Sequence, residues 1–188
     1  MKFFSMYAQS SVAEYVVPGE EILQLQRGCL KSEFQFLDHT PITVPVIEDG
    51  GEEFPDFLIY AEIIPLVTEN FRQILDRAGV NNLFYKPVNL TYGARNTENY
   101  FLALPPRIDC LNFTDSVIEV EENEFAQEDE LIKEVVKIVI DENKIGNYKI
   151  FKLPVGFVNQ EIIVTEDLKT AIEKAELENV YFSSLKGD

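Results

Sequence analysis

A segment of 20 residues occurs twice in this 188-residue chain, and it constrains the fold more than any other feature. Residues 66–85 read LVTENFRQILDRAGVNNLFY, and residues 163–182 read IVTEDLKTAIEKAELENVYF. Five of the aligned positions are identical, and most of the others keep their chemical class. The chain is therefore expected to build the same local structure twice.

Each copy predicts a strand, a helix and a second, aromatic-rich strand. Thr68 and Thr165 suit helix N-caps, because a threonine oxygen can accept a hydrogen bond from an amide of the first turn. Gly79 suits the left-handed position after the first helix. Glu176 stands at that place in the second copy, so the second helix is expected to end with a different cap. Apolar residues with the i, i+3, i+4, i+7 spacing of a buried helix face are Phe71, Ile74, Leu75 and Ala78, and then Leu168, Ala171, Ile172 and Ala175.

The rest of the chain is mostly typical of strands. β-Branched and aromatic residues predict strands at residues 2–7, 57–60, 100–104, 116–120, 135–140 and 148–153. Residues 20–27 predict a short helix, residues 41–55 an irregular acidic loop, and residues 141–147 a hairpin turn. The predicted class is α+β, with mostly antiparallel strands and two short helices in a duplicated strand–helix–strand unit.

The length fits one ordinary domain or two small ones. We expect residues 1–55 to form an N-terminal segment, or a small β-rich lobe of the same domain. Residues 56–188 are then the α+β domain that contains the repeat. The pair Gly50-Gly51 is the expected place of the boundary.

The charge is concentrated in two parts of the sequence. The chain has 33 acidic and 16 basic residues, a net charge of −17. Residues 32–71 and residues 108–132 contain no lysine or arginine, and each window holds nine acids. The remaining residues are almost neutral. This charge argues against binding nucleic acid through its phosphates, and equally against an anionic membrane.

Two interpretations of the acidic windows stay open. They are solvated loops that keep the protein in solution, or they face one partner with a basic surface. Under the second interpretation the candidate contact residues of the later window are Glu119, Glu121, Glu122, Glu124, Glu128, Asp129 and Glu130. Those of the earlier window are Glu48, Asp49, Glu52 and Glu53.

The sequence offers little material for catalysis or for a cofactor. Its one histidine, His39, fits a surface or turn position, and one histidine with two cysteines does not make the usual zinc set. Cys29 and Cys110 are expected to be reduced and partly buried. Phosphate-binding glycine loops and the G-x-S-x-G elbow are missing from the sequence. We therefore expect no catalytic residue, no metal and no cofactor.

Neither a spanning helix nor a secretory signal is expected. The sequence has no run of roughly 18 apolar residues. Its first residues carry one lysine and a very short apolar run before they turn polar. A cytoplasmic protein is the expectation.

The repeat, together with the strands between and after it, resembles a bacterial family of immunity proteins from polymorphic toxin systems. The residues that carry the resemblance are residues 66–69, 78–88, 148–153 and 163–182. The resemblance covers roughly residues 57–185. It implies a cytoplasmic antidote that binds a cognate toxin domain and blocks it, with no reaction of its own. Toxins of such systems include nucleases, whose basic substrate-binding surface would suit an acidic partner.

Two other functions remain open from the residues alone. A hydrolase with a carboxylate pair would need a deep pocket that holds two carboxyls and raises the pKa of at least one. A general protein-interaction module or scaffold would need neither a toxin nor a pocket. The resemblance favours the immunity protein over both.

Overall fold

The computed structural model describes residues 1–9, 14–19, 37–47, 51–60, 64–92, 95–120, 132–154 and 161–185. The helices within these residues are α2 (Glu69–Arg77), α3 (Glu142–Ile145) and α4 (Glu166–Lys174). The strands are β1 (Phe3–Tyr7), β2 (Ile42–Pro45), β3 (Phe57–Tyr60), β4 (Ile64–Thr68), β5 (Phe84–Tyr92), β6 (Arg95–Leu104), β7 (Val117–Val120), β8 (Ile132–Lys137), β9 (Ile150–Phe151), β10 (Ile162–Thr165) and β11 (Tyr181–Ser184). The α+β class predicted from the sequence is confirmed.

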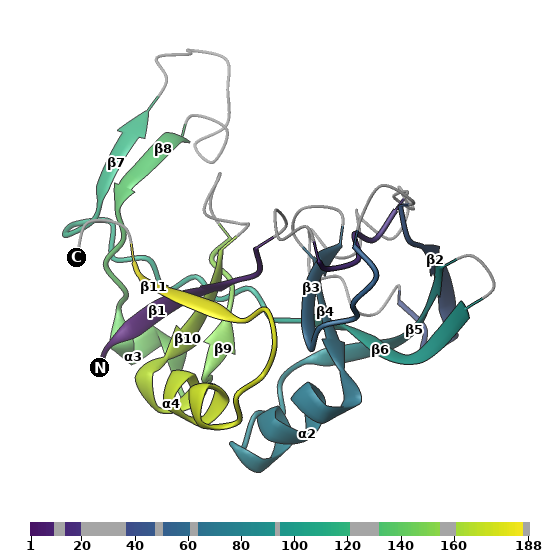
Figure 1. The fold of residues 1–188 in the computed structure, drawn as a ribbon. Coiled ribbons are helices and arrows are strands. Elements are labelled where there is room, and N and C mark those ends of the chain that lie inside the picture. Colours follow the sequence, from purple (N-terminus) through teal and green to yellow (C-terminus); the bar gives the residue numbers. More distant parts are fainter. Residues whose placement is uncertain are drawn as a thin grey trace.

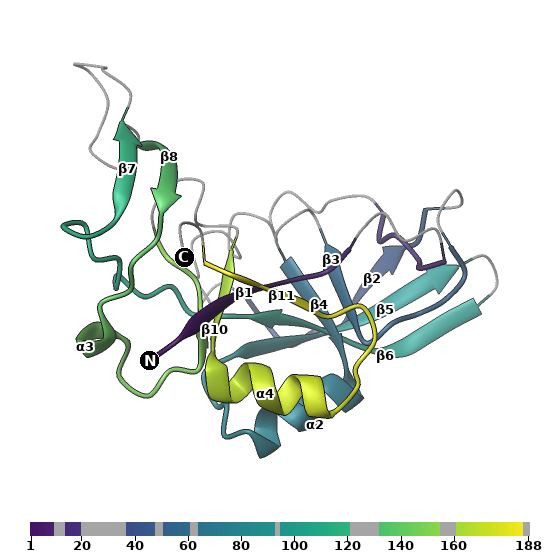
Figure 2. The same ribbon diagram turned by 60° about the vertical axis from the view of Figure 1, so that its left-hand side comes forward.

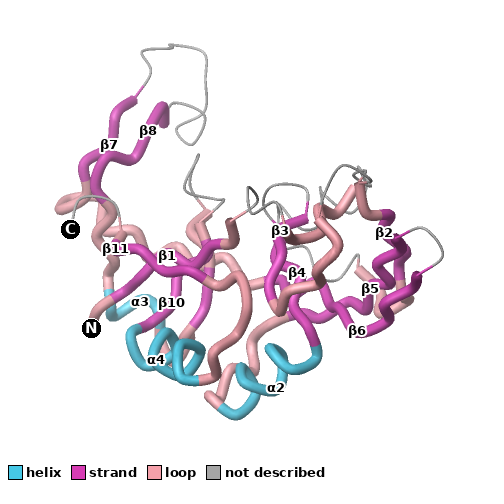
Figure 3. Tube along the Cα trace, viewed as in Figure 1, coloured by secondary structure: helices cyan, strands magenta, loops and turns pink. Residues whose placement is uncertain are grey.

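The strands form two larger sheets and one small one (Figure 1). The first sheet has the order β2-β5-β6-β4-β3, and the second has the order β11-β1-β10-β9. Strands β7 and β8 pair with each other as a separate hairpin. All neighbours in these sheets are antiparallel except β2 and β5, which run parallel. Figure 3 shows α2 and α4 on the same side of the two larger sheets.

The two larger sheets repeat the same pairing register. In the first sheet Val67 is the pairing partner of Phe57 on one side and of Phe101 on the other. In the second sheet Val164, which is the repeat equivalent of Val67, is paired with Ile150 and Phe4. The repeat is therefore larger than the sequence shows, because it includes four strands and a helix in each half.

The fourth strand of the second half comes from the opposite end of the sequence. Tyr85 is paired with Ala103 of β6, and its repeat equivalent Phe182 is paired with Met6 of β1. Strand β1 thus stands in the second sheet where β6 stands in the first. The second half is a circularly permuted copy, in which the last strand of the unit has become the first strand of the chain.

One hydrophobic core joins the two halves. It contains Phe71 and Leu75 of α2 together with Leu168 and Ile172 of α4, and all four side chains are buried. The helices lie side by side beneath the sheets (Figures 1 and 2). The buried face of each helix is the one that the apolar spacing predicted. Because both helices contribute to one core, neither half can be removed without exposing the other.

Each half also donates a side-chain hydrogen bond to the other, which is partly buried at Asn82 and buried at Asn179. Asn82 of the first copy donates from Nδ2 to the carbonyl of Ile150, at 3.0 Å. Its equivalent, Asn179, donates from Nδ2 to the carbonyl of Phe57, at 2.9 Å. Ile150 and Phe57 hold equivalent places in β9 and β3. The repeated asparagine is thus a connector between the halves.

The two helix starts differ in detail. Thr68 caps α2, because its Oγ1 accepts from the amide of Phe71 at 3.2 Å while donating to Asp56. Thr165 begins α4 in the same backbone conformation, but its hydroxyl donates to the carboxylate of Asp167 and makes no cap bond. The predicted side-chain cap is confirmed for Thr68 and is wrong for Thr165, whose hydroxyl donates to Asp167 and accepts no hydrogen bond from the first turn.

The two helix ends are more alike than the sequence predicted. Gly79 has the expected left-handed backbone, with φ of 80°. Glu176 has φ of 52°, so the second helix ends with the same geometry. The expectation of a different cap is therefore wrong. A side chain at this conformation costs about 1 kcal/mol, and the conserved chain path in the two halves imposes it on Glu176.

Four local predictions need correction. The acidic loop at residues 41–55 contains β2, whose backbone pairs with β5 between Pro41 and Pro45, where proline is tolerated at strand ends. The turn at residues 141–147 contains α3, because the Asp141 carboxylate caps its first turn. The strand predicted at residues 148–153 is reduced to β9, and the one at residues 135–140 is displaced to β8. The helix predicted at residues 20–27 lies outside the described residues.

Residues before position 56 contribute to both larger sheets. Strand β1 pairs with β10 and β11, and strand β2 pairs with β5. The backbone of Gly51 lies against Glu14 and Tyr15, and a Cβ atom there would collide with main-chain atoms. The division of the chain into residues 1–55 and 56–188 stays a prediction.

Candidate functional site

The acidic contact residues predicted from the sequence fall in two separate places. Glu119 is exposed on β7, in the hairpin beside the second sheet. Glu52 and Glu53 are exposed just before β3 of the first sheet. The other candidates, which lie outside the described residues, are Glu48, Asp49, Glu121, Glu122, Glu124, Glu128, Asp129 and Glu130. The structure therefore assigns the two windows to different elements.

The later window belongs to the element that extends furthest from the body. Strands β7 and β8 project from the second half as a two-stranded arm, seen in both orientations of Figures 1 and 2. One face of the arm turns inward, where Ile118 and Val135 are paired in register and pack on the hydrophobic cluster of the second half. The opposite face carries Glu119 and two exposed valines, Val117 and Val136. This face is both acidic and apolar.

A cavity of about 330 Å³ opens on the first half, beside α2. The described residues that line it are His39, Arg72, Leu83, Phe84, Tyr85, Pro87 and Phe101, and none is an acid. The Arg72 guanidinium lies 5.2 Å from the centre of the Tyr85 ring and 5.0 Å from that of Phe101. Burial raises the pKa of the Tyr85 hydroxyl above its ordinary value. The lining is that of a packed aromatic–cation cluster and does not supply the paired carboxyls of a glycosidase-like site.

The second half repeats this aromatic–cation cluster. Lys169, the repeat equivalent of Arg72, lies 5.0 Å from the ring centre of Phe4 and 5.5 Å from that of Phe182. Phe4 and Phe182 correspond to Phe101 and Tyr85 of the first half. Since the arrangement occurs in both halves, we interpret it as part of the duplicated scaffold.

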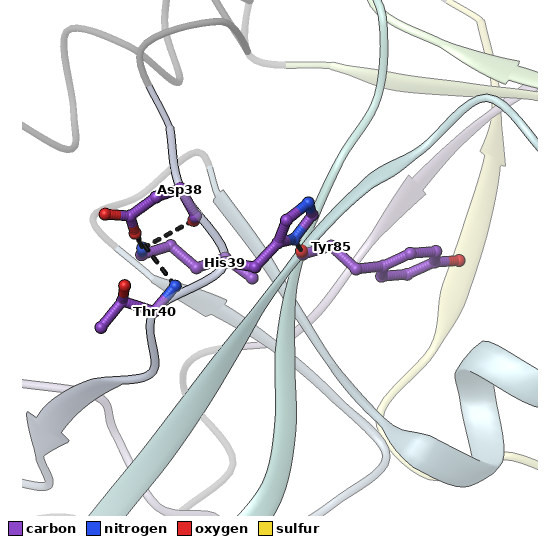
Figure 4. Close-up of polar contacts among 5 residues, drawn as sticks. Asp38, His39, Thr40 and Tyr85 are labelled. Atoms are coloured by element: carbon purple, nitrogen blue, oxygen red, sulfur yellow. Dashed lines mark hydrogen bonds and ion pairs between the residues drawn. The ribbon is translucent and has the colours of Figure 1, made fainter.

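An ion pair fastens the segment before β2 to the first sheet (Figure 4). Lys86 of β5 is 5% exposed, and its ammonium donates to the carboxylate of Asp38 at 2.6 Å and to the Asp38 carbonyl at 2.8 Å. The Lys86 ammonium and the Thr40 amide lower the pKa of Asp38. His39 is exposed, as the sequence predicted, and its Nδ1 donates to the carbonyl of Tyr85 at 2.9 Å. These contacts position the segment on the first sheet.

The described residues offer no arrangement that holds a metal ion. Among them, no three histidine, cysteine or acidic side chains lie close enough to bind one. Cys110 is a free, buried thiol whose pKa burial raises to about 12, so the protonated and unreactive form predominates. Cys29 lies outside the described residues. None of the helices in the described ranges is long and apolar enough to cross a membrane.

Sequence reasoning missed the apolar part of the projecting arm. Val117 and Val136 were read as ordinary strand residues, which usually point toward a core. Phe113, just before β7, lies outside every predicted element, and it is among the most exposed of the large apolar side chains in the described residues. The register of the hairpin decides which valines face outward, and no local signal in the sequence fixes that register.

The fold and this arm define a duplicated α+β protein whose projecting hairpin presents an acidic and apolar face. The sequence profile of the immunity protein family Imm11 matches residues 7–187, nearly the whole chain, and the protein belongs to this family. The resemblance found from residues 57–185 is thereby confirmed, and it extends through the N-terminal residues as well. A comparison with curated proteins found no match.

Proposed function

We propose that this protein is an antidote that binds a cognate bacterial toxin domain in the cytoplasm and blocks it by covering it, without catalysing a reaction. Membership of an immunity protein family over residues 7–187 is the observation that carries this proposal. The described residues support it, since the aromatic–cation cluster recurs in both halves as part of the scaffold, and the Lys86–Asp38 ion pair fastens a segment to the first sheet.

The charge distribution supports a basic partner. The two base-free windows hold 18 of the 33 acids, and Glu52, Glu53 and Glu119 are exposed where the structure describes them. A nuclease toxin would offer the complementary surface, because it must attract the phosphates of its substrate. In this proposal the antidote occupies that surface or covers it beside the active site. The acids accelerate the encounter.

Co-expression tests the function itself. The large protein encoded next to this chain would be expressed with and without it, and cell survival and co-purification would be scored. We expect growth to be rescued and a stable complex to be recovered. Continued toxicity with no complex would contradict the antidote and leave a general interaction module as the better explanation.

Charge reversal tests the acidic windows. Changing Glu121, Glu122, Glu124 and Glu128 to lysine should slow association with the toxin about tenfold or more at low ionic strength, and less at physiological ionic strength. A control with the same change of net charge reverses Asp76, Glu173, Glu176 and Glu178, which are exposed near the C-terminal ends of α2 and α4. Equal effects of the two variants would mean that only net charge matters. An unchanged rate in the first variant would refute the role of the later window.

A further inference from the structure

The β7–β8 hairpin is anchored on one face only. Ile118 and the buried Val135 pack on the second-half cluster, and the chain after β8 continues into that cluster through Ile138 and Ile140. In the described residues β7 and β8 pair only with each other. A two-stranded ribbon has little stability of its own, so this inner packing is what holds the arm in place. The outer face contributes nothing to the core.

A bulge gathers apolar side chains on that outer face. Val117 is paired with Lys137 and Ile118 with Val135, so Val136 is the extra residue between two pairs. At such a bulge two residues of one strand oppose a single residue of the other. Val136 therefore shares the outer face with Val117, and the two side chains are 43% and 49% exposed. Neighbouring exposed valines on a projecting strand pair are typical of an interaction surface.

The base of the arm holds an exposed aromatic side chain on a fixed turn. The side-chain oxygen Oδ1 of Asn112 accepts from the backbone amides of Thr114 and Asp115, at 3.1 and 3.2 Å. The Asn112 amide donates to the carbonyl of Val139 at 2.8 Å, which ties the turn to the chain after β8. Phe113 lies within this turn and is 53% exposed. A preordered backbone lowers the entropy lost when such a side chain is buried by a partner.

The surrounding charge selects the occupant of this surface. Asp109, Asp115 and Glu119 are exposed near it, and the sequence between β7 and β8 has six acids and no base. The acids outnumber Lys137, the base that is paired with Val117. A second copy of this chain would bring the same negative charge, so self-association through the arm is opposed by repulsion. A basic protein surface with an apolar hollow is complementary both to the acidic charge and to the exposed valine side chains.

We propose that the outer face of the β7–β8 hairpin, with Phe113 at its base, is the anchor that keeps the toxin domain bound. This inference rests on the proposed antidote function, and it assigns the association rate and the dissociation rate to two different kinds of residue. The acids govern how fast the complex forms. Val117, Val136 and Phe113 govern how slowly it dissociates, since a few well-packed, fully desolvated residues carry most of the affinity at an interface and mutations there act mainly on the dissociation rate.

The test replaces Val117 and Val136 together by threonine, which keeps their β-branched shape and strand preference. Binding is measured with the toxin domain purified from the co-expressed complex, at low and at physiological ionic strength. We expect dissociation to be about tenfold faster at both ionic strengths, with association unchanged. A second variant, Phe113→Ser, should show the same signature. If the double variant melts at a lower temperature than the parent, Phe113→Ser still tests the anchor, because it leaves both strands of the hairpin unchanged.

Two matched controls separate the anchor from general surface polarity. Ile47 and Tyr148 are large, apolar and exposed to a similar degree, but lie away from the arm. Ile47→Thr and Tyr148→Ser should leave both rates unchanged. If the hairpin variants also dissociate like the parent, the anchor is refuted while the antidote function stands. If the parent protein neither binds the toxin domain nor protects cells, both proposals fall. A hairpin variant that turns a self-associated protein into a monomer in sedimentation would identify a second copy as the occupant, and would overturn the proposal.

Discussion

The two halves of this molecule build the same unit of four strands and a helix with different chain paths, and β2 adds a fifth strand to the first sheet. The first half takes its strands β3, β4, β5 and β6 in sequence order. The second half takes β9, β10 and β11 from one end of the sequence and β1 from the other. The register of the strands, the helix ends and the cross-half asparagines are nevertheless equivalent. The comparison teaches that the packing arrangement, and not the order of connection, is what the duplication preserves.

The two halves also contact each other through one pair of equivalent positions that carry opposite charges. Asp56 of the first half accepts from the Thr68 hydroxyl at 2.6 Å and from the amide of Glu178 in the second half at 3.2 Å. At the equivalent place the second half has Lys149, which donates to the carbonyl of Ala78 in the first half at 2.9 Å. Lys149 needs a carboxylate, and Asp167 provides it at 2.7 Å. A charge reversal at one position has therefore been matched by a new acid two residues after Thr165.

The largest effect should come from the shared core. Phe71→Ala removes a fully buried ring that stacks with Phe57, and it should reduce the free energy of unfolding by about 3–5 kcal/mol. Because α2 and α4 share one core, hydrogen exchange should accelerate in β10 and α4 as well as in β4 and α2. Faster exchange confined to the first half would show that the two halves unfold independently.

The connecting asparagines should differ in strength. Asn179→Ala removes two hydrogen bonds and puts alanine at φ of 61°, so we expect a loss of about 2–3 kcal/mol in chemical denaturation. Asn82→Ala removes one bond at an ordinary φ, and about 1 kcal/mol is expected. Asn179→Gly removes the backbone strain, so its loss of stability reports the two lost hydrogen bonds alone. Equal losses for Asn82→Ala and Asn179→Ala would show that the two connectors are energetically equivalent.

Exchanging the residues at the two helix ends should produce opposite effects. Glu176→Gly should raise the free energy of unfolding by about 1 kcal/mol, because glycine adopts a left-handed backbone without strain. Gly79→Glu should lower it by a similar amount, since a Cβ there meets no neighbouring atom and only the backbone conformation resists it. Thermal melting of both variants checks the pair. A destabilised Glu176→Gly would mean that the glutamate side chain makes a compensating contact.

The smallest effect concerns acid stability, and it is expected at the start of α4 in the second half. Hydrogen bonds from Lys149 and Thr165 lower the pKa of Asp167 below its ordinary value of 3.8. A carboxyl with a lowered pKa stabilises the fold above its ordinary pKa, and this stabilisation is lost as the pH falls through the folded-state pKa. The parent protein should therefore lose stability more steeply than Asp167→Asn as the pH falls below about 4.

Urea unfolding at several acidic pH values measures this difference. Adding Lys149→Met to Asp167→Asn should leave the pH dependence of the single variant unchanged, since the carboxylate that titrates is already gone. Parallel curves for the parent and Asp167→Asn would show that solvent screens the pair completely.

The repeated unit could be predicted from the sequence because its signals are local. The spacing of Phe71, Leu75, Leu168 and Ile172 identifies the buried helix faces without knowledge of their partners. The place of β1 could not be predicted, because its partners are about 155 to 180 residues away and its equivalence to β6 is concealed by the permutation. When Phe3–Tyr7 is aligned with residues 100–104, only the second position is identical, and it is a phenylalanine in each.

For a similar reason, the acidic part of the candidate binding surface could be predicted from the sequence, and its apolar part could not. Glu119 could be proposed from composition, since an acidic side chain in a base-free window is almost always at the surface. The exposure of Val117 and Val136 depends on a bulge in the pairing of two strands. Strand register is a property of the assembled sheet, and the sequence of either strand alone does not contain it.

The permuted position of β1 also sets an order of events during synthesis. Strands β3 to β6 leave the ribosome one after another, so the first sheet can pair as it emerges. Strand β1 leaves before all of them, yet Phe4 must wait for Val164 and Ser184, which are made about 160 and 180 residues later. Until then its apolar side chains have no sheet to join. The second sheet is therefore incomplete until β10 and β11 have been made. Its assembly is the folding step at which unpaired strands are most exposed to association with other chains.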